Sequence, residues 1–230
     1  MPLTAVAPDL WSHVHRHRIP GGAVLLGRMN VVRLGDGALW VHSPTPIDDA
    51  LAAEIAALGP VAYVVAPNCF HHLNVLPFLK RFPGAKVYGA PGLAQKRPDL
   101  TLVGTLDDGA ALPWAGVLDH IALGGVPKLG EVVFLHRGSR SLLVTDLLFN
   151  MTAPENWATG LVLRIMGTYK RLGPSRLLRW RLTKDRRALK ADVERMLAWD
   201  FVRVLPGHGD VFESPETRER VRASLGWVLA

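Results

Sequence analysis

The sequence predicts an α+β fold in which helices cover a sandwich of β-sheets. Hairpin patterns come first along the chain, then a strand–helix–strand unit, further hairpins, helices and one last strand. This order suits stacked sheets better than one purely parallel sheet. The chain has 230 residues, of which 49% are hydrophobic, and it contains neither a linker nor a repeat. Such a chain can bury a substantial core, so we expect a single domain over residues 1–230.

The first half of the chain predicts a hairpin, a helix and a βαβ unit. Residues 29–41 hold two β-branched, apolar runs around Gly35-Asp36-Gly37, which is typical of a hairpin. Residues 48–58 have the spacing and composition of a helix that Gly59-Pro60 would end. The βαβ unit that we expect next comprises a strand at 61–66, a short helix at 75–81 and a strand at 86–90.

The second half predicts short strands followed by helices. Gly, Pro and Asp separate the expected strands at 100–106, 118–123, 131–136 and 141–145, the last two of which form a hairpin. Residues 157–181 are basic and amphipathic, and we expect them to be helical in part, with a break at Gly173-Pro174. A helix at 184–199, a strand at 201–205 and a last helix opening at Ser214, with Pro215 at its first position, complete the order.

The charge is concentrated in one segment. The chain carries 27 Lys and Arg against 20 Asp and Glu, a net charge of +7. Within residues 164–187 lie Arg164, Lys170, Arg171, Arg176, Arg179, Arg181, Lys184, Arg186 and Arg187. This basic segment could attract an anionic substrate, a nucleic acid or an acidic membrane surface, and a solvated helical face is the interpretation that we favour. Because no nucleic-acid-binding motif accompanies it, we do not expect a nucleic acid as partner.

Composition also bears on location. No apolar run approaches the roughly 18–20 residues that a membrane span needs. The first residues, interrupted by Pro2, Pro8 and Asp9, do not resemble a secretory signal, and the lone Cys69 cannot form an internal disulfide. We therefore expect a cytoplasmic protein with a small, anionic molecule as its partner. The oligomeric state stays open.

Ligand-type side chains directly follow three of the expected strands: His71 and His72, Asp146, and His208. Strand ends fix geometry while the loops after them supply functional groups. Imidazoles with a carboxylate could hold zinc, and they also fit iron or manganese. The alternatives are a histidine pair at a helix start, and an aspartate that caps a turn.

Three segments together resemble the metallo-β-lactamase superfamily. Residues 66–80 (APNCFHHLNVLPFLK) resemble its signature loop T-H-x-H-x-D-H, which a short helix follows. Residues 144–149 (VTDLLF) resemble its strand ending in G-D-x-x-F, and residues 204–209 (VLPGHG) its C-terminal P-G-H-G loop. The similarity covers nearly the whole chain in order and spacing, and it points to a divergent branch with Pro-Asn-x-x-His-His in the signature loop. It implies a four-layer αβ/βα sandwich.

The resemblance also implies which metal position is lost. The family's first two motif histidines and its intermediate histidine form one metal site, and here those positions read Pro67, Cys69 and Gly125, with His120 several residues too early. The positions of the second site are all able to bind a metal: His71, His72, Asp146 and His208. We therefore expect one divalent transition metal, zinc or alternatively iron, with a protein that binds no metal as the remaining alternative.

This site predicts a metal-dependent hydrolase of a small anionic or ester-like substrate, with the basic segment lining or covering the pocket. Four protein ligands nearly fill a tetrahedral zinc shell, which argues against efficient hydrolysis. A catalytically inactive metallo-β-lactamase-like binding or scaffold protein and an iron-dependent oxidoreductase are the alternatives. No catalytic residue is assigned from the sequence.

Other polar residues are placed near this site or set aside. Asn68 and Glu131 could orient the ligands or simply bond to backbone, and Cys69 is interpreted as a small buried side chain, with ligand or nucleophile as alternatives. His13, His15 and His17 alternate, so they share a face if extended. We interpret them as part of an exposed, flexible N-terminal strand.

Overall fold

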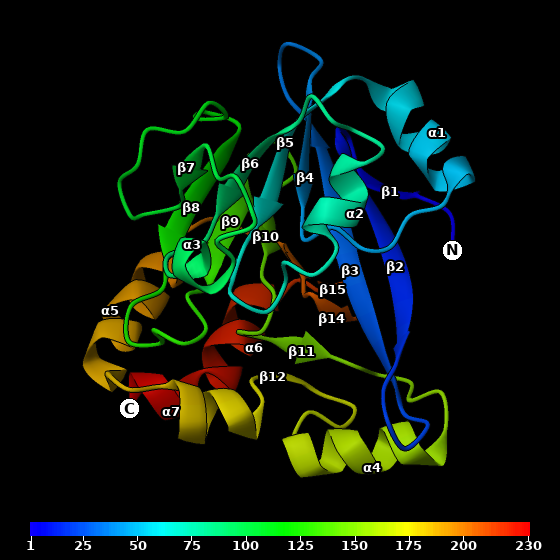
Figure 1. Ribbon diagram of the computed structural model, residues 1–230. Helices are drawn as coiled ribbons and strands as arrows, with labels where there is room; N and C mark the ends of the chain where they lie inside the picture. The colour runs from blue at the N-terminus through cyan, green and yellow to red at the C-terminus, as the bar shows by residue number, and fades with distance from the viewer.

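Two β-sheets face each other, and helices cover the outer face of each, in a computed structural model that describes residues 1–230 (Figure 1). The first sheet has the order β1-β2-β3-β4-β5-β6-β7, antiparallel up to β4 and parallel beyond it. Its strands are β1 (Thr4–Ala7), β2 (Leu10–Arg18), β3 (Val24–Arg33), β4 (Leu39–His42), β5 (Val61–Ala66), β6 (Lys86–Gly89) and β7 (Gly104–Thr105).

The second sheet has the order β15-β13-β10-β9-β8, and a small third sheet has the order β12-β11-β14. The strands of the second sheet are β8 (Leu118–Ala122), β9 (Val132–His136), β10 (Ser141–Leu143), β13 (Arg203–Leu205) and β15 (Phe212–Glu213). The third comprises β11 (Phe149–Asn150), β12 (Leu172–Gly173) and β14 (His208–Gly209).

The helices lie in two groups and at one edge. Against the first sheet lie α1 (Asp49–Leu58), α2 (Val75–Leu79) and α3 (Leu93–Lys96); against the second lie the π-helix η1 (Leu178–Leu182), α5 (Arg186–Leu197), α6 (Thr217–Ser224) and α7 (Gly226–Leu229). The remaining helix, α4 (Trp157–Met166), lies apart at the edge of the molecule (Figure 1). No helix has the length and apolarity that crossing a membrane would require.

Three apolar clusters fill the spaces between four layers. Because side chains alternate along a strand, Val31 of β3 points to the helices of the first sheet while Val32 points to the second sheet. On β9, Phe134 faces the first sheet and Val133 faces α5 and its neighbours. The four-layer αβ/βα sandwich is thus confirmed, since each sheet buries both of its faces. That residues 1–230 form one domain stays a prediction.

Several predicted elements have the expected bounds, and each has a local cause. The 61–66 strand is β5 with the same ends, and it forms the predicted parallel pair with β6. Helix α1 starts where Asp48 accepts a hydrogen bond from Leu51 N at 2.8 Å, and Gly59 follows its last residue. Residues 157–181 are helical in part, as expected, although η1 continues to Leu182.

Other bounds were wrong. The strand expected at 100–106 shrinks to Gly104–Thr105, because Leu100 N bonds to Arg97 O in a turn after α3. The last helix opens at Thr217 rather than near Ser214, because Thr217 Oγ1 accepts a hydrogen bond from Ser214 N and closes a turn there. The helix expected from 184 begins at Arg186, since Asp185 caps it through Ala188 N.

The N-terminal strand is also corrected. Strand β2 pairs with β3 along all nine of its residues, and His13 is buried. The segment is therefore a strand that β3 pairs along its whole length and whose His13 is not exposed, although β1 pairs only with its Leu10–Ser12 part.

Candidate metal centre

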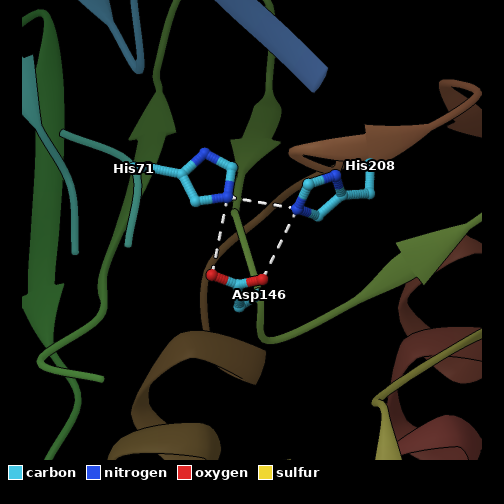
Figure 2. Close-up of side chains that lie close together, drawn as sticks. All are labelled: His71, Asp146 and His208. Carbon is cyan, nitrogen blue, oxygen red and sulfur yellow. Dashed lines mark hydrogen bonds and ion pairs between the residues drawn. The ribbon is translucent and has the colours of Figure 1, made fainter. Parts of the chain in front are cut away.

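Three of the predicted ligands converge from three separate segments of the chain (Figure 2). His71 follows β5, Asp146 follows β10 and His208 begins β14. The two Nε2 atoms of His71 and His208 are 3.2 Å apart. Asp146 places Oδ2 at 3.5 Å from His71 Nε2, and its Oδ1 lies 3.5 Å from His208 Nε2. All three side chains are mostly buried and retain a small exposed fraction.

These separations fit the face of a metal coordination shell. Zinc–ligand distances of about 2.0–2.1 Å put the ligand atoms of a tetrahedral shell about 3.3 Å apart. The observed separations of 3.2, 3.5 and 3.5 Å bracket that value. Two imidazole nitrogens and a carboxylate are also a donor set that suits zinc or iron better than magnesium or calcium. The residues therefore fit a divalent transition metal.

Hydrogen bonds fix which ring nitrogens face the cluster. His208 Nδ1 donates to Leu26 O at 2.8 Å, because a carbonyl can only accept, so the lone pair of a neutral His208 lies on Nε2. His71 Nδ1 shares a 2.8 Å hydrogen bond with Ser43 Oγ. Both Nε2 atoms are thus directed at the same point, as metal-binding histidines require.

Burial and the close contact of the three side chains shift their pKa values. Burial lowers the pKa of His71 to about 4. Although burial alone would raise the pKa of Asp146, the facing His71 and His208 rings hold it below its usual range. Burial also disfavours a charged His208, but the hydrogen bond and charge of Asp146 raise the pKa of His208 above its ordinary value. A proton on His208 Nε2 and a metal ion among the three atoms would therefore neutralise the same carboxylate.

Asn68 and Glu131 hold Asp146 and His71 in place. Asn68 Nδ2 donates to Asp146 Oδ2 at 2.7 Å, while its Oδ1 accepts from His71 N at 2.7 Å. The carboxylate of Glu131, which is fully buried, accepts from Asp146 N at 2.9 Å and from Thr145 N at 2.7 Å. Burial and the nearby charge of Asp146 raise the pKa of Glu131. The sequence left open whether these two residues orient the predicted ligands or bond to backbone. Asn68 does both, since it contacts the Asp146 carboxylate and the His71 N–H, and Glu131 bonds to backbone.

The two glycines beside His208 are required by close packing. A Cβ on Gly207 would lie 2.9 Å from Thr145 Cα and 3.0 Å from His71 Cε1, and Gly209 has φ +98° with its Cα against the Asn150 carbonyl. Arg28, buried and without a carboxylate partner, donates to Pro206 O at 3.1 Å and to Gly209 O at 2.5 Å. The loop is thus held on both sides of His208.

Sequence reasoning did not identify Arg28, and it set His17 aside. A Cβ on Gly27 would lie 2.5 Å from His17 Nε2, so the ring of His17 lies directly against the glycine. His17 and the three clustered side chains line one cavity of about 240 Å³. The alternation of His13, His15 and His17 was the available signal, and the pairing of β2 with β3 was needed to interpret it.

The other predicted site residues lie elsewhere. The buried ring of His72 places Nδ1 at 2.7 Å from Arg97 Nη1, so the structure does not bring His72 into the cluster. Cys69 is buried with Sγ at 3.5 Å from Pro91 O, and burial raises the pKa of its thiol. His120, on β8, has Nε2 at 3.0 Å from Asp107 O.

Close packing at Gly125 excludes a histidine from the position where the resemblance predicts the intermediate one. This residue has φ +75°, and a Cβ there would overlap the backbone carbonyl of Asp185. Lys184 N donates to Gly125 O at 2.7 Å, which fixes the close approach to the start of α5. A histidine could not occupy this position without moving α5.

Comparison with known proteins gives a family and a fold. The family described as "Domain of unknown function (DUF4336)" matches residues 22–161, which include His71 and Asp146 but not His208. No curated protein sequence matches this chain.

Solved structures resemble the whole chain. A metallo-β-lactamase from Pontibacter korlensis has a TM-score of 0.68 and 16% identity, covering 98% of this chain and 97% of its own. The metallo-β-lactamase FIM-1 from Pseudomonas aeruginosa, in its mono-zinc form, has a TM-score of 0.65 and 15% identity, covering 99% and 95%. The Flv1 flavodiiron core from Synechocystis sp. PCC6803 has a TM-score of 0.69 and 12% identity, covering 98% of this chain and 60% of that one. The chain therefore has the metallo-β-lactamase fold.

Proposed function

The chain belongs to the DUF4336 family of domains of unknown function, and we propose that it is a metal-dependent hydrolase with one divalent metal on His71, Asp146 and His208. The observation that most directly supports the proposal is that the two Nε2 atoms lie 3.2 Å apart and that each lies 3.5 Å from a carboxylate oxygen of Asp146. The fold supports the proposal, because one of its structural neighbours, FIM-1, is described in a mono-zinc form. Zinc is the metal that we propose.

Three ligands rather than four favour catalysis. Structural zinc sites have four protein ligands, whereas catalytic sites have three and keep one position for water or substrate. The 2.7 Å contact of His72 Nδ1 with Arg97 Nη1 supports leaving His72 out of the proposed ligand set, and a three-ligand site is compatible with hydrolysis. A metal in such a site polarises a substrate oxygen and lowers the pKa of water.

The residues that line the cavity at the candidate centre determine which substrates can reach it. The cavity of about 240 Å³ admits only a small substrate or the reacting part of a larger one. Polar residues, among them His17, Ser43, Thr45 and Asn74, contribute to its lining. These groups can donate hydrogen bonds to an ester or to an anionic oxygen, which supports a small anionic or ester-like substrate.

The metal content of the purified protein tests the ligand set. We expect close to one equivalent of zinc or iron in the wild-type protein, and its loss in His208→Ala, because two ligands seldom retain a transition metal. His72→Ala should keep the metal, since its ring bonds to Arg97 outside the cluster. His120→Ala, which changes a histidine near Asp107, is the matched control.

Each result bears on one alternative. Loss of metal in His72→Ala would contradict the three-residue set and restore the four-residue one. Wild-type protein that takes up no transition metal, even after incubation with zinc, would overturn the proposal in favour of a non-catalytic binding protein.

An iron-dependent oxidoreductase is the second candidate, and the donor set favours it. Two histidines and one carboxylate with open positions are also the ligands of non-haem Fe(II) oxygenases. The Flv1 flavodiiron core, a structural neighbour, has the same fold. Iron in place of zinc in protein purified without added metal would favour this candidate.

A further inference from the structure

Large apolar side chains are exposed on α4 and η1. Of the ten large hydrophobic residues that are exposed in the structure, five lie here: Trp157, Leu161, Ile165, Leu177 and Trp180. Trp157 is 80% exposed, Ile165 63% and Trp180 68%. Residues four apart share one side of a helix, so Trp157, Leu161 and Ile165 form a stripe along α4. We call these five residues the docking face.

The docking face is continuous from α4 to η1. Arg176, which precedes η1, donates from Nη1 to Ile165 O at 3.1 Å, and its guanidinium lies 5.6 Å from the centre of the Trp180 ring. The other side of α4 packs on the hairpin between β2 and β3, where Val24 N donates to Thr159 Oγ1 at 2.8 Å. Figure 1 shows α4 at the lower edge of the molecule, below the tip of the β2–β3 hairpin. The apolar stripe is therefore the outward side of a firmly attached helix.

The basic segment, residues 164–187, overlaps the docking face in sequence. Its nine members are Arg164, Lys170, Arg171, Arg176, Arg179, Arg181, Lys184, Arg186 and Arg187, and only Asp185 offsets them. None of the nine forms an ion pair, whereas Arg137, Arg195 and Arg203 elsewhere are each paired with a carboxylate. Arg164, Arg176 and Arg179 contact aromatic rings and Arg186 a backbone carbonyl, but no side-chain carboxylate neutralises any of the nine charges, which can therefore attract an external anionic surface.

We propose that α4 and η1 dock this protein onto the surface of an anionic phospholipid bilayer. A helix with apolar side chains on its free face and Lys and Arg around them lies in the plane of the membrane interface. Tryptophan rings prefer the headgroup level, and anionic headgroups attract the surrounding cations. Charge complementarity therefore selects an anionic bilayer over a second copy of this chain, because two such faces would bring two basic segments together.

An apolar cavity supports a lipid as the occupant. Its volume is about 120 Å³, and its lining runs from the half-exposed Leu177 and from Met166 to Asp146 and His208. Leu178, Leu182 and Phe149 contribute most of the remaining apolar lining. An apolar chain that enters beside Leu177 would end next to the clustered side chains. This would place a bilayer-derived molecule at the candidate centre, although docking itself does not depend on a metal.

Co-sedimentation with vesicles tests the proposal. We expect the wild-type protein to bind vesicles of phosphatidylcholine mixed with phosphatidylglycerol, and to bind vesicles of phosphatidylcholine alone at least about tenfold more weakly. Trp157→Ser with Ile165→Ser should weaken binding to the anionic vesicles by at least about tenfold, because it removes the apolar anchors. Arg181→Gln, Lys184→Gln and Arg187→Gln together should do the same, since none of these side chains has an ion-pair partner to lose.

Control variants test whether the loss of vesicle binding is specific to the docking face and the basic segment, or follows from any loss of charge or of an exposed apolar side chain. Lys80→Gln with Lys86→Gln removes charges at the end of α2 and at the start of β6, outside the basic segment, and Val103→Ser removes an exposed apolar side chain at another place. These controls should bind as the wild type does, and circular dichroism should show that all variants are folded.

Three results would overturn the proposal. The first is equal binding to both kinds of vesicle, or to neither. The second is weakening by the control lysine substitutions as strong as that by the basic-segment substitutions. The third is a stable dimer by light scattering that dissociates in the Trp157→Ser, Ile165→Ser variant, since a second copy would then cover the docking face. Because the readout is binding, failure of the metal proposal would leave these expectations unchanged.

Discussion

Asp146 is held by two residues whose own positions depend on strands far from it in sequence. Glu131 lies just before β9 and accepts the backbone N–H of Asp146, while Asn68 in the loop after β5 donates to its carboxylate. Asn68 also accepts from His71 N, so one amide fixes two of the three proposed ligands. At the scale of single residues, the cluster therefore depends as much on Asn68 as on the ligands.

Asn68→Ala should weaken metal binding by about 10–100-fold, the usual cost of removing a residue that orients ligands. It should also reduce the free energy of unfolding by about 2–3 kcal/mol, because it leaves Asp146 Oδ2, His71 N and Phe70 N without their partner. Chelator competition measures the first effect and urea denaturation the second.

Asn74→Ala is a suitable control, since Asn74 lines the same cavity but its side chain does not cap α2. Unchanged metal affinity in Asn68→Ala would contradict the role of Asn68 in fixing the ligands.

The Pro-Gly-His-Gly loop shows how an element positions a ligand. Gly207 packs against Thr145 and the His71 ring, and Arg28 of β3 donates to the carbonyls on either side of the loop. Strand β14 then pairs with β11, where Phe149 lies opposite His208 and stacks on its ring at 4.8 Å. At the scale of elements, three strands and one loop thus fix a single imidazole.

Gly207→Ala should displace both His71 and the backbone at Thr145, since neither can move away easily in this packed region. We expect a loss of unfolding free energy of about 1–3 kcal/mol, as for other overpacked sites, and loss of bound metal. Thermal denaturation and metal content measure these two effects.

Gly84→Ala is the matched control, because a Cβ on Gly84 meets nothing within 4 Å and its φ is not positive. Full metal content in Gly207→Ala would show that the loop can adjust and would contradict the steric argument.

Between the two sheets, His42 couples pH to the stability of the whole molecule. It is fully buried, lies between Trp40 of the first sheet and Phe134 of the second, and leaves Nε2 without a hydrogen-bond partner. Burial lowers the pKa of His42 to about 3. In the folded protein this ring therefore stays neutral down to about pH 3. In the unfolded chain it takes up a proton near the ordinary histidine pKa of 6.5.

Because the unfolded state binds the additional proton, stability is complete above pH 6.5 or so and falls as the pH decreases toward 3. The loss should be about 1.4 kcal/mol for each pH unit in that window. His42→Leu should remove this contribution, since an apolar side chain suits a site between two sheets and loses only the 3.4 Å contact with Asn30. Urea denaturation of both proteins across the pH range measures the difference.

The same pH dependence in His42→Leu and in the wild type would contradict the assignment to His42. His120→Leu, which makes the same replacement at a half-buried histidine of β8, is the control with which the His42→Leu protein is compared.

Much of the fold is determined by local sequence. The bounds of β5 follow from an unbroken apolar run, and the start and end of α1 follow from the cap at Asp48 and from Gly59. The four layers follow from hydrophobic alternation, since strands such as β3 and β9 are apolar on both faces and must be covered on both. The segment that became β2 was misjudged, because its polar histidines do not reveal that β3 pairs with it along its full length.

The candidate site was predictable only in part, for a physical reason. The residue types and their places after strands selected His71, His72, Asp146 and His208, because chemistry and strand order are local properties. Which of two adjacent histidines faces the cluster depends on Arg97 from α3's end and on Gly207 from a distant loop, since neighbouring side chains in a loop point in different directions. His17 and Arg28 likewise reach the cavity only because β2 pairs with β3 and because Arg28 bonds to the 206–209 loop. The sequence by itself thus determined the layers and the types of side chain offered at the strand ends, and long-range packing decided which of these side chains meet.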